Sequence, residues 1–148
     1  MKTIDIIRTG TPETPGYNDT FAIIENGIEL LAGRLSTEPN PYQPGTLKPW
    51  VDVYARIAEG LYVWELIPNH PKYGRCILIN GGGDVPTLNP NPNHNRAYVA
   101  SEIFGHRGDT ATWRGSRGCI TVSPIDEEVF FKVFKDGEKG KLIIRKAV

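Results

Sequence analysis

Two residues of this sequence have the types and the spacing to form a nucleophilic pair. Cys119 follows Gly118 at the boundary between a loop and an apolar run, where a side chain is accessible and a glycine lets another backbone approach closely. His106 lies upstream, and an imidazole beside a thiol takes its proton. The backbone N–H groups of Gly118 and Cys119 would then donate to the oxyanion of an acyl intermediate. The pattern predicts cysteine-based acyl transfer.

Three arginines surround this pair along the chain, at positions Arg107, Arg114 and Arg117, and Trp113 stands among them. Guanidinium groups bind carboxylates through two parallel hydrogen bonds, and nearby cations favour a thiolate over a thiol. We therefore expect the arginines to bind an acidic substrate and Trp113 to line its groove. The competing interpretation is a solvated arginine face with no role in binding.

The same segment resembles the catalytic domain of the L,D-transpeptidases, the YkuD-type family, whose motif is a histidine followed after a loop by Ser-x-Gly-Cys. Here the motif reads Gly105-His106 and then Ser116-Arg117-Gly118-Cys119. Residues 58–62 are similar to that family's Pro-x-Gly-x-Tyr strand entry, and the ending is similar too, with a short helix, a glycine and a last strand.

The resemblance implies a mixed β-sandwich with one short helix. It also implies an enzyme whose cysteine is acylated by a peptidoglycan stem peptide at an L,D bond and whose histidine is the base. These roles fall on Cys119 and His106, with Ser116 and Gly118 shaping the site. No cofactor and no metal is implied. Water as the acceptor would make the protein an L,D-carboxypeptidase and an amine would make it an L,D-transpeptidase, and the sequence leaves both open.

The chain also departs from the family pattern. Arg117 stands where the family often has histidine, Thr121 stands where it has arginine, and the interval between His106 and Cys119 is shorter. Shorter intervals resemble the compact relatives that phages and secretion systems direct against bacterial walls. The resemblance therefore favours a phage lysin or a secreted effector, for which an immunity or secretion partner is expected.

Length and composition set the remaining limits. The 148 residues fit one domain over residues 1–148, which is long enough to bury a core without disulfides or metals. Seventeen basic residues balance seventeen acidic ones, which disfavours a nucleic-acid partner. No apolar run reaches the roughly 20 residues of a membrane span, and the first residues lack the apolar core of a signal peptide. We expect synthesis in the cytoplasm and action at the cell wall or periplasm after release or injection.

Short apolar runs separated by glycines and prolines predict a mainly β fold. Strands are expected at residues 2–7, 20–25, 28–31, 51–57, 61–67, 76–79, 98–104, 119–122 and 142–144. Asn26-Gly27 predicts a type I′ hairpin turn. Residues 36–50 are predicted to form a loop, and residues 80–97 a long loop with the role of a lid.

One helix is predicted after the cysteine strand. Ser123 is expected as its N-cap and Pro124 at its first position, and Gly137 ends it. Its apolar face is expected to comprise Ile125, Val129, Phe130, Val133 and Phe134.

Two alternatives to an enzyme remain. One is a non-catalytic β-rich module of a virion or assembly, in which the cysteine motif serves packing. The other is a carbohydrate or peptide binder that uses the aromatic residues and the long loop. Cys76, in an apolar run, is expected in the core, and His70 and His94 at the surface.

Overall fold

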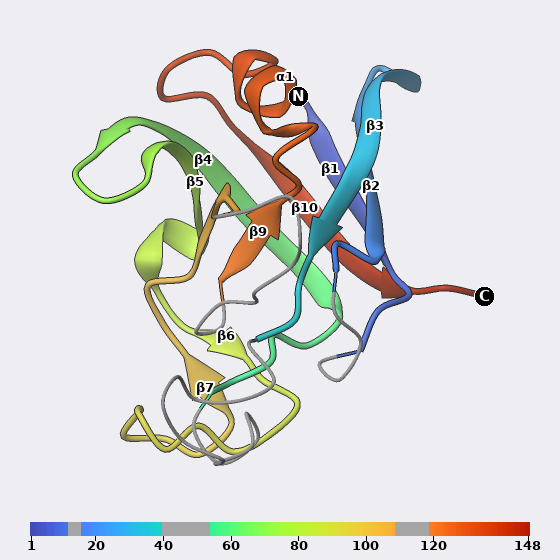
Figure 1. Ribbon diagram of the computed structural model, residues 1–148. Coiled ribbons are helices and arrows are strands. Elements are labelled where there is room, and N and C mark those ends of the chain that lie inside the picture. Colours follow the sequence, from blue (N-terminus) through green and yellow to red (C-terminus); the bar gives the residue numbers. More distant parts are fainter. Residues whose placement is uncertain (12–15, 40–53, 109–118) are drawn as a thin grey trace.

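The fold is mainly β with one short helix, as the sequence predicts (Figure 1). The computed structural model describes residues 1–11, 16–39, 54–108 and 119–148. Its elements are β1 (Thr3–Arg8), β2 (Asp19–Glu25), β3 (Ile28–Ser36), β4 (Gly60–His70), β5 (Gly74–Ile79), the 3₁₀ turn η2 (Asn80–Gly82), β6 (Val85–Pro86), β7 (Val99–Ala100), β8 (Phe104–Arg107), β9 (Ile120–Val122), α1 (Glu127–Lys132) and β10 (Lys139–Lys146).

The sequence predicts a mixed sandwich, whereas the strand pairings close eight strands into a barrel. The strand order is β1-β10-β4-β5-β8-β9-β3-β2, and β6 pairs with β7 in a separate small sheet. The sheet is mixed, because β1 runs parallel to β10 and β8 parallel to β9 while the other neighbours are antiparallel. Closure depends on the pairing of the first strand with the last, which leaves neither with an open edge.

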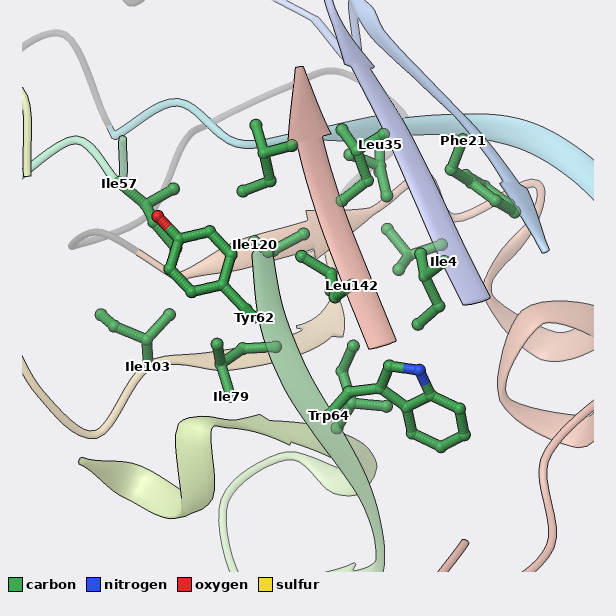
Figure 2. Close-up of a cluster of buried hydrophobic side chains, with 14 of the residues drawn as sticks. Ile4, Phe21, Leu35, Ile57, Tyr62, Trp64, Ile79, Ile103, Ile120 and Leu142 are labelled. Atoms are coloured by element: carbon green, nitrogen blue, oxygen red, sulfur yellow. The ribbon is translucent and has the colours of Figure 1, made fainter. Parts of the chain in front are cut away.

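The barrel interior is filled by alternate residues of its strands. Ile4, Leu142, Ile120 and Ile79 come from four different strands and point toward one another (Figure 2). All are at most 1% exposed, as expected when one face of each strand is buried. Trp64 extends this core toward α1, where its ring packs on Phe134 at 4.5 Å between centroids.

The Asn26-Gly27 turn is confirmed. Both residues have positive φ, 53° and 75°, as a type I′ turn requires, and they join β2 to β3. The predicted strand at residues 2–7 is present with its bounds shifted by one residue, and those at residues 76–79 and 142–144 are present and longer than predicted. Strand β4 runs past its predicted end at Ile67 to His70, because a register shift between these two residues accommodates Pro68.

Two strand predictions are wrong in the described residues. Residues 54–56 form no strand, and Ile57 makes only an isolated bridge to Thr87; residues 51–53 lie outside the described part. The expected strand at residues 98–104 is divided into β7 and the start of β8, with a positive φ at Glu102 between them. The predicted loop at residues 36–50 begins one residue late, after β3, and its residues 40–50 are not described.

The long loop at residues 80–97 is anchored in its middle. Asn89 is buried, accepts a hydrogen bond from the Arg56 amide at 2.9 Å and donates to the Tyr54 carbonyl at 2.7 Å. The loop also contains η2 and β6. The Asn89 side chain therefore forms hydrogen bonds with backbone groups of residues 54–56 that a neighbouring strand would otherwise bond.

The helix starts later than predicted and ends at Lys132 rather than at Gly137, and its predicted buried face is confirmed at Phe130 and Phe134 but wrong at Ile125 and Val129. Ser123 and Pro124 lie in a turn before α1, and the Asp126 carboxylate accepts a hydrogen bond from the Arg34 amide at 3.0 Å. Ile125 and Val129 are 85% and 53% exposed. The buried face consists of Phe130, Phe131 and Phe134. Phe130 meets Phe21 of β2 edge-on at 4.9 Å and Phe134 at 5.5 Å, and these ring contacts set which side of the helix faces the barrel.

A buried ionic cluster lies where β1 and β3 end and β2 begins. Asp19 is fully buried and accepts four hydrogen bonds, from the amides of Thr9, Gly10 and Thr37 and from the Thr37 hydroxyl, at 2.7–3.0 Å. Glu38 pairs with Arg56 at 2.5 Å and lies 3.6 Å from Arg8. We call this group the Asp19 cluster.

No helix in the described residues is both long and apolar enough to cross a bilayer.

Candidate active site

His106 lies on β8, and Cys119 lies immediately before β9, the parallel neighbour of that strand. Strand β8 pairs with β9 so that Gly105 is opposite Ile120 and His106 is opposite Thr121, and Cys119 directly precedes β9. Strand geometry then puts the Cα atoms of His106 and Cys119 diagonally across the two strands, roughly 8 Å apart. The predicted proximity of the two residues is thus supported by the sheet register.

The face on which these side chains lie follows from Gly105. A Cβ atom at Gly105 would meet the Ile77 side chain at 2.5 Å, so this position faces the packed core. Successive side chains of a strand point to opposite faces, so Phe104 and His106 point away from the core. The Cys119 Sγ atom lies 3.5 Å from the backbone nitrogen of Phe104, which donates a hydrogen bond to it.

Tyr73 links the two candidate catalytic residues, and the sequence analysis missed it. Its ring stacks on the His106 ring at 4.0 Å between centroids and 6° between planes. Its hydroxyl donates a hydrogen bond to Cys119 that lowers the pKa of the thiol. Tyr73 belongs to the turn between β4 and β5 and is far from both residues in the sequence, so no local pattern indicates this contact.

His70 and Phe104 complete an aromatic cluster around this tyrosine. His70 stacks on Tyr73 at 4.9 Å and meets Phe104 edge-on at 4.8 Å. The Nδ1 atom of His70 accepts hydrogen bonds from the amides of Lys72 and Tyr73. The expectation that His70 is a plain surface residue is therefore wrong, because it orders the turn that carries Tyr73.

The hydrogen bond of His106 defines which ring nitrogen is a base. Nδ1 lies 2.8 Å from the carbonyl oxygen of Arg107. A carbonyl only accepts hydrogen bonds, so we assign the proton of the neutral ring to Nδ1, which leaves the lone pair on Nε2. In this tautomer Nε2 is the atom that accepts a proton.

The surroundings of the Cys119 thiol favour its protonated form. Burial raises its pKa from the ordinary value of 9.0, and the Phe104 amide, the Lys72 charge and the Tyr73 hydroxyl oppose this rise without cancelling it. We expected arginines to favour the thiolate. Among the described residues the stabilising cation is instead Lys72.

The second cysteine is buried, as expected, but on the sheet face that carries His106 rather than in the barrel interior. Cys76 is fully buried, and burial followed by the nearby Cys119 raises its pKa to about 11. Extending the β5–β8 pairing by one residue places it opposite His106. Neither cysteine is in a disulfide.

Arg107 lines a cavity next to this site. The cavity has a volume of about 360 Å³ and is also bordered by Tyr73, Glu127 and Phe131. Arg107 is exposed at the end of β8. A cation at the wall of a cavity that shares Tyr73 with the cysteine site fits the expectation of a substrate-binding arginine.

The other predicted site residues lie outside the described residues. They are Trp113, Arg114, Ser116, Arg117 and Gly118. Their roles in substrate binding and in the oxyanion site stay predictions. His94 is half-buried, and its Nε2 atom lies 3.5 Å from Asp84 in the long loop.

The described residues contain no group of three or more histidine, cysteine, aspartate and glutamate side chains placed to hold a metal ion. The groups that the described residues bring together at this site are the Cys119 thiol, the His106 imidazole and the Tyr73 phenol. Comparison of the chain with family models, with curated proteins and with solved structures gives no match.

Proposed function

We propose that this protein is a cysteine acyltransferase or peptidase that acts on L,D bonds of peptidoglycan stem peptides, as the resemblance to the L,D-transpeptidases implies. The observation that carries the proposal is the position of Cys119 directly before β9, beside the parallel strand β8 that carries His106, with Tyr73 in contact with both residues. The mixed β-sandwich of that family is part of the proposal. Its support is the mixed sheet in which a short helix separates β9 from β10.

The reaction would begin with attack of the Cys119 sulfur on the carbonyl carbon of the scissile bond. His106 Nε2 takes the thiol proton as the C–S bond forms, because burial raises the pKa of the thiol and disfavours a free thiolate. The carbonyl oxygen becomes an oxyanion, to which the backbone N–H groups of Gly118 and Cys119 are proposed to donate.

Collapse of this intermediate breaks the C–N bond. The imidazolium returns its proton to the departing amine, and a thioester on Cys119 remains. Water or a second amine then attacks the thioester while His106 removes the proton of the attacking group. The thiolate leaves and is protonated, which restores Cys119 and His106. Water yields a shortened stem peptide, and an amine yields a cross-linked or exchanged one.

Digestion of purified muropeptides tests the proposal. Wild type, Cys119→Ala and His106→Ala are incubated with the same muropeptides, and the products are read by mass spectrometry. We expect loss of a terminal residue or change of a cross-link with wild type alone, and the product mass separates hydrolysis from amine exchange. His94→Ala is a matched control, because His94 contacts Asp84 in the long loop. Unchanged muropeptides with all four folded proteins would contradict the proposal.

One observation favours a second candidate, a non-catalytic β-rich or wall-binding module. The half-buried thiol of Cys119 has a raised pKa, which suits a structural cysteine as well as a nucleophile. This candidate predicts that the protein sediments with bacterial walls, that Cys119→Ala sediments equally, and that wild type releases no product.

A further inference from the structure

The cavity beside the candidate active site has an unusual distribution of charge. It lies between the β4–β5 turn, the end of β8 and α1, and we call it the hairpin–helix cavity. Its ionisable side chains other than Tyr73 are Arg75, Arg107, Glu127, Glu128 and Lys132. Its volume of about 360 Å³ is within the range of small-molecule sites, roughly 300–1,000 Å³.

Three of these five charges have partners in the fold. Arg75 donates to the carbonyl of Phe131 at 2.8 Å, to the carbonyl of Phe134 and to the Asp136 carboxylate, so its guanidinium caps the end of α1. Lys132 and Glu128 form an ion pair at 2.8 Å at the solvent-exposed rim of the cavity. These contacts fix the positions of Arg75, Glu128 and Lys132 and neutralise their charges.

Glu127 and Arg107 are left without such contacts. The Oε2 atom of Glu127 is buried and accepts no hydrogen bond from any group in the described residues. Arg107 lies close enough for its charge to lower the pKa of Glu127 against the larger, opposite effect of burial. No ion pair within 4.0 Å joins the two in the part of the chain that the structure describes. An anion and a cation therefore face the same cavity without contact.

We propose that the hairpin–helix cavity binds a small zwitterion, an amino-acid group whose ammonium is held by Glu127 and whose carboxylate is held by Arg107. A primary ammonium has three donors for the unsatisfied carboxylate oxygen, and a guanidinium takes a carboxylate through two hydrogen bonds. The cavity shares Tyr73 with the Cys119 site, so the ligand would lie next to the reacting atoms.

The inference rests on the proposed function, because that function determines which ligands are tested. The test itself measures binding and needs no catalytic turnover. Two sources supply this chemistry: a free amino acid that acts as the acyl acceptor, and the diaminopimelate residue of the donor stem. D-Alanine represents the first and a stem tripeptide ending in diaminopimelate represents the second. Titrations followed by amide NMR, on wild type and on Cys119→Ala, measure their affinities without turnover.

We expect at least one of these ligands to bind, and each single-charge analogue to bind about tenfold to a hundredfold more weakly. For D-alanine the analogues are N-acetyl-D-alanine, which lacks the ammonium, and D-alaninamide, which lacks the carboxylate. Binding of D-alanine supports the acceptor as the occupant, and binding of the tripeptide alone supports the donor stem. Equal binding of a ligand and its analogues, or no binding of either ligand, would overturn the inference.

Variants of the two residues identify the cavity as the binding site. Glu127→Gln and Arg107→Gln should each weaken binding by a similar factor, and Arg107→Gln should no longer distinguish D-alanine from its amide. Glu128→Gln is the matched control, because Glu128 is the next residue on the same helix and is paired with Lys132. Thermal unfolding checks that all three variants are folded. Equal loss in the Glu128 variant would place binding elsewhere and contradict the inference.

A failure of the inference can be told apart from a failure of the proposed function. Selective zwitterion binding by a protein that leaves all muropeptides unchanged would support the cavity and reject the enzyme. Turnover of muropeptides by wild type, without zwitterion binding by wild type, would reject the cavity and support the enzyme.

Discussion

The Asp19 cluster and the Cys119 site both contain buried polar groups, but these groups are hydrogen-bonded more completely in the Asp19 cluster. Asp19 accepts four hydrogen bonds of 2.7–3.0 Å, Glu38 is held by Arg56, and the Arg8 Nη1 atom, which makes no hydrogen bond to another described residue, still lies 3.2 Å from the Glu59 carboxylate. At the other site the thiol accepts hydrogen bonds from the Phe104 amide and the Tyr73 hydroxyl, but the nearby Glu127 has a buried oxygen with neither a hydrogen bond nor an ion pair among the described residues. Buried polar groups are normally satisfied, so the first region serves stability, and the Glu127 oxygen indicates a place for a ligand in the second.

The largest effect on stability is expected from Asp19→Asn. The amide nitrogen of asparagine is a donor, so at least one of the buried donors around this position loses its acceptor. We expect a loss of about 3 kcal/mol in the free energy of unfolding, measured by urea denaturation. Asp84→Asn is the control, since Asp84 is half-exposed, and its effect should be within about 1 kcal/mol. Similar losses in both variants would contradict the special role of the Asp19 cluster.

His106→Ala should give the opposite result, a large effect on activity and a small one on stability. Loss of a general base lowers turnover by about 10²–10⁴-fold. The ring is partly exposed and its stacking on Tyr73 contributes only about 0.5–1.5 kcal/mol, which bounds the loss of stability. Muropeptide turnover and urea denaturation of the same sample measure both. A fully active variant, or one that loses as much stability as Asp19→Asn, would remove the contrast between the two regions.

Tyr73→Phe distinguishes the role of the Tyr73 hydroxyl from the role of its ring. The variant keeps the stacking on His106 but loses the hydrogen bond that lowers the pKa of Cys119. The thiolate fraction at neutral pH therefore falls, and we expect alkylation of Cys119 by iodoacetamide to slow by about tenfold.

The pH dependence of the same reaction gives a second readout. Because burial holds the pKa of Cys119 above 9.0, the wild-type rate should still be rising at pH 9, and the curve of Tyr73→Phe should lie further toward alkaline pH. Tyr98→Phe, at an exposed tyrosine, is the control. A rate that reaches its plateau at mildly acidic pH would show an imidazole-paired thiolate and contradict the protonated resting thiol.

The smallest effect is expected at the edge of the molecule, where Lys2 pairs with Glu138 at 2.8 Å. Burial raises the pKa of Glu138, but the hydrogen bond from Lys2 and other contacts lower it further, so the net shift is downward from 4.5. A carboxyl group whose pKa is lower in the folded than in the unfolded protein stabilises the fold at pH values above its pKa in the unfolded state. This stabilisation is lost as the pH falls through the pKa in the folded state.

Glu138→Gln tests this linkage. Since the pair is partly exposed, we expect the variant to lose at most about 1 kcal/mol at pH 7 and to differ less from wild type at pH 3. Urea denaturation at both pH values gives the two differences. A difference that grows as the pH falls would contradict the sign of the shift.

Local signals predict the parts of this fold that local physics determines. Asn26-Gly27 tolerates positive φ at two successive positions, and the turn forms as expected. Cys119 lies directly before a strand, as the glycine and the apolar run indicate. Closure of the sheet is not local, because it depends on the pairing of β1 with β10, and no turn signal reports such a pairing.

The parts of the site that the sequence analysis missed depend on contacts between distant segments. Tyr73 reaches His106 because β5 pairs with β8, and Glu127 reaches the same cavity because α1 packs on the barrel end. The start of α1 was misplaced for a related reason. Asp126 is held by the backbone of β3 at Arg34, so this tertiary contact, rather than the Ser123-Pro124 signal, determines where the helix begins.

The most direct test of the central claim is the mass of the acylated protein. Wild type is mixed with a stem tetrapeptide, quenched in acid within the first turnovers, and measured intact and after proteolysis. A nucleophilic Cys119 predicts an added mass equal to the acyl tripeptide on the peptide that contains Cys119, none on the peptide that contains Cys76, and none in Cys119→Ala. Shortened or exchanged stems with no adduct in wild type and undiminished turnover by Cys119→Ala would contradict the claim that Cys119 carries the acyl group.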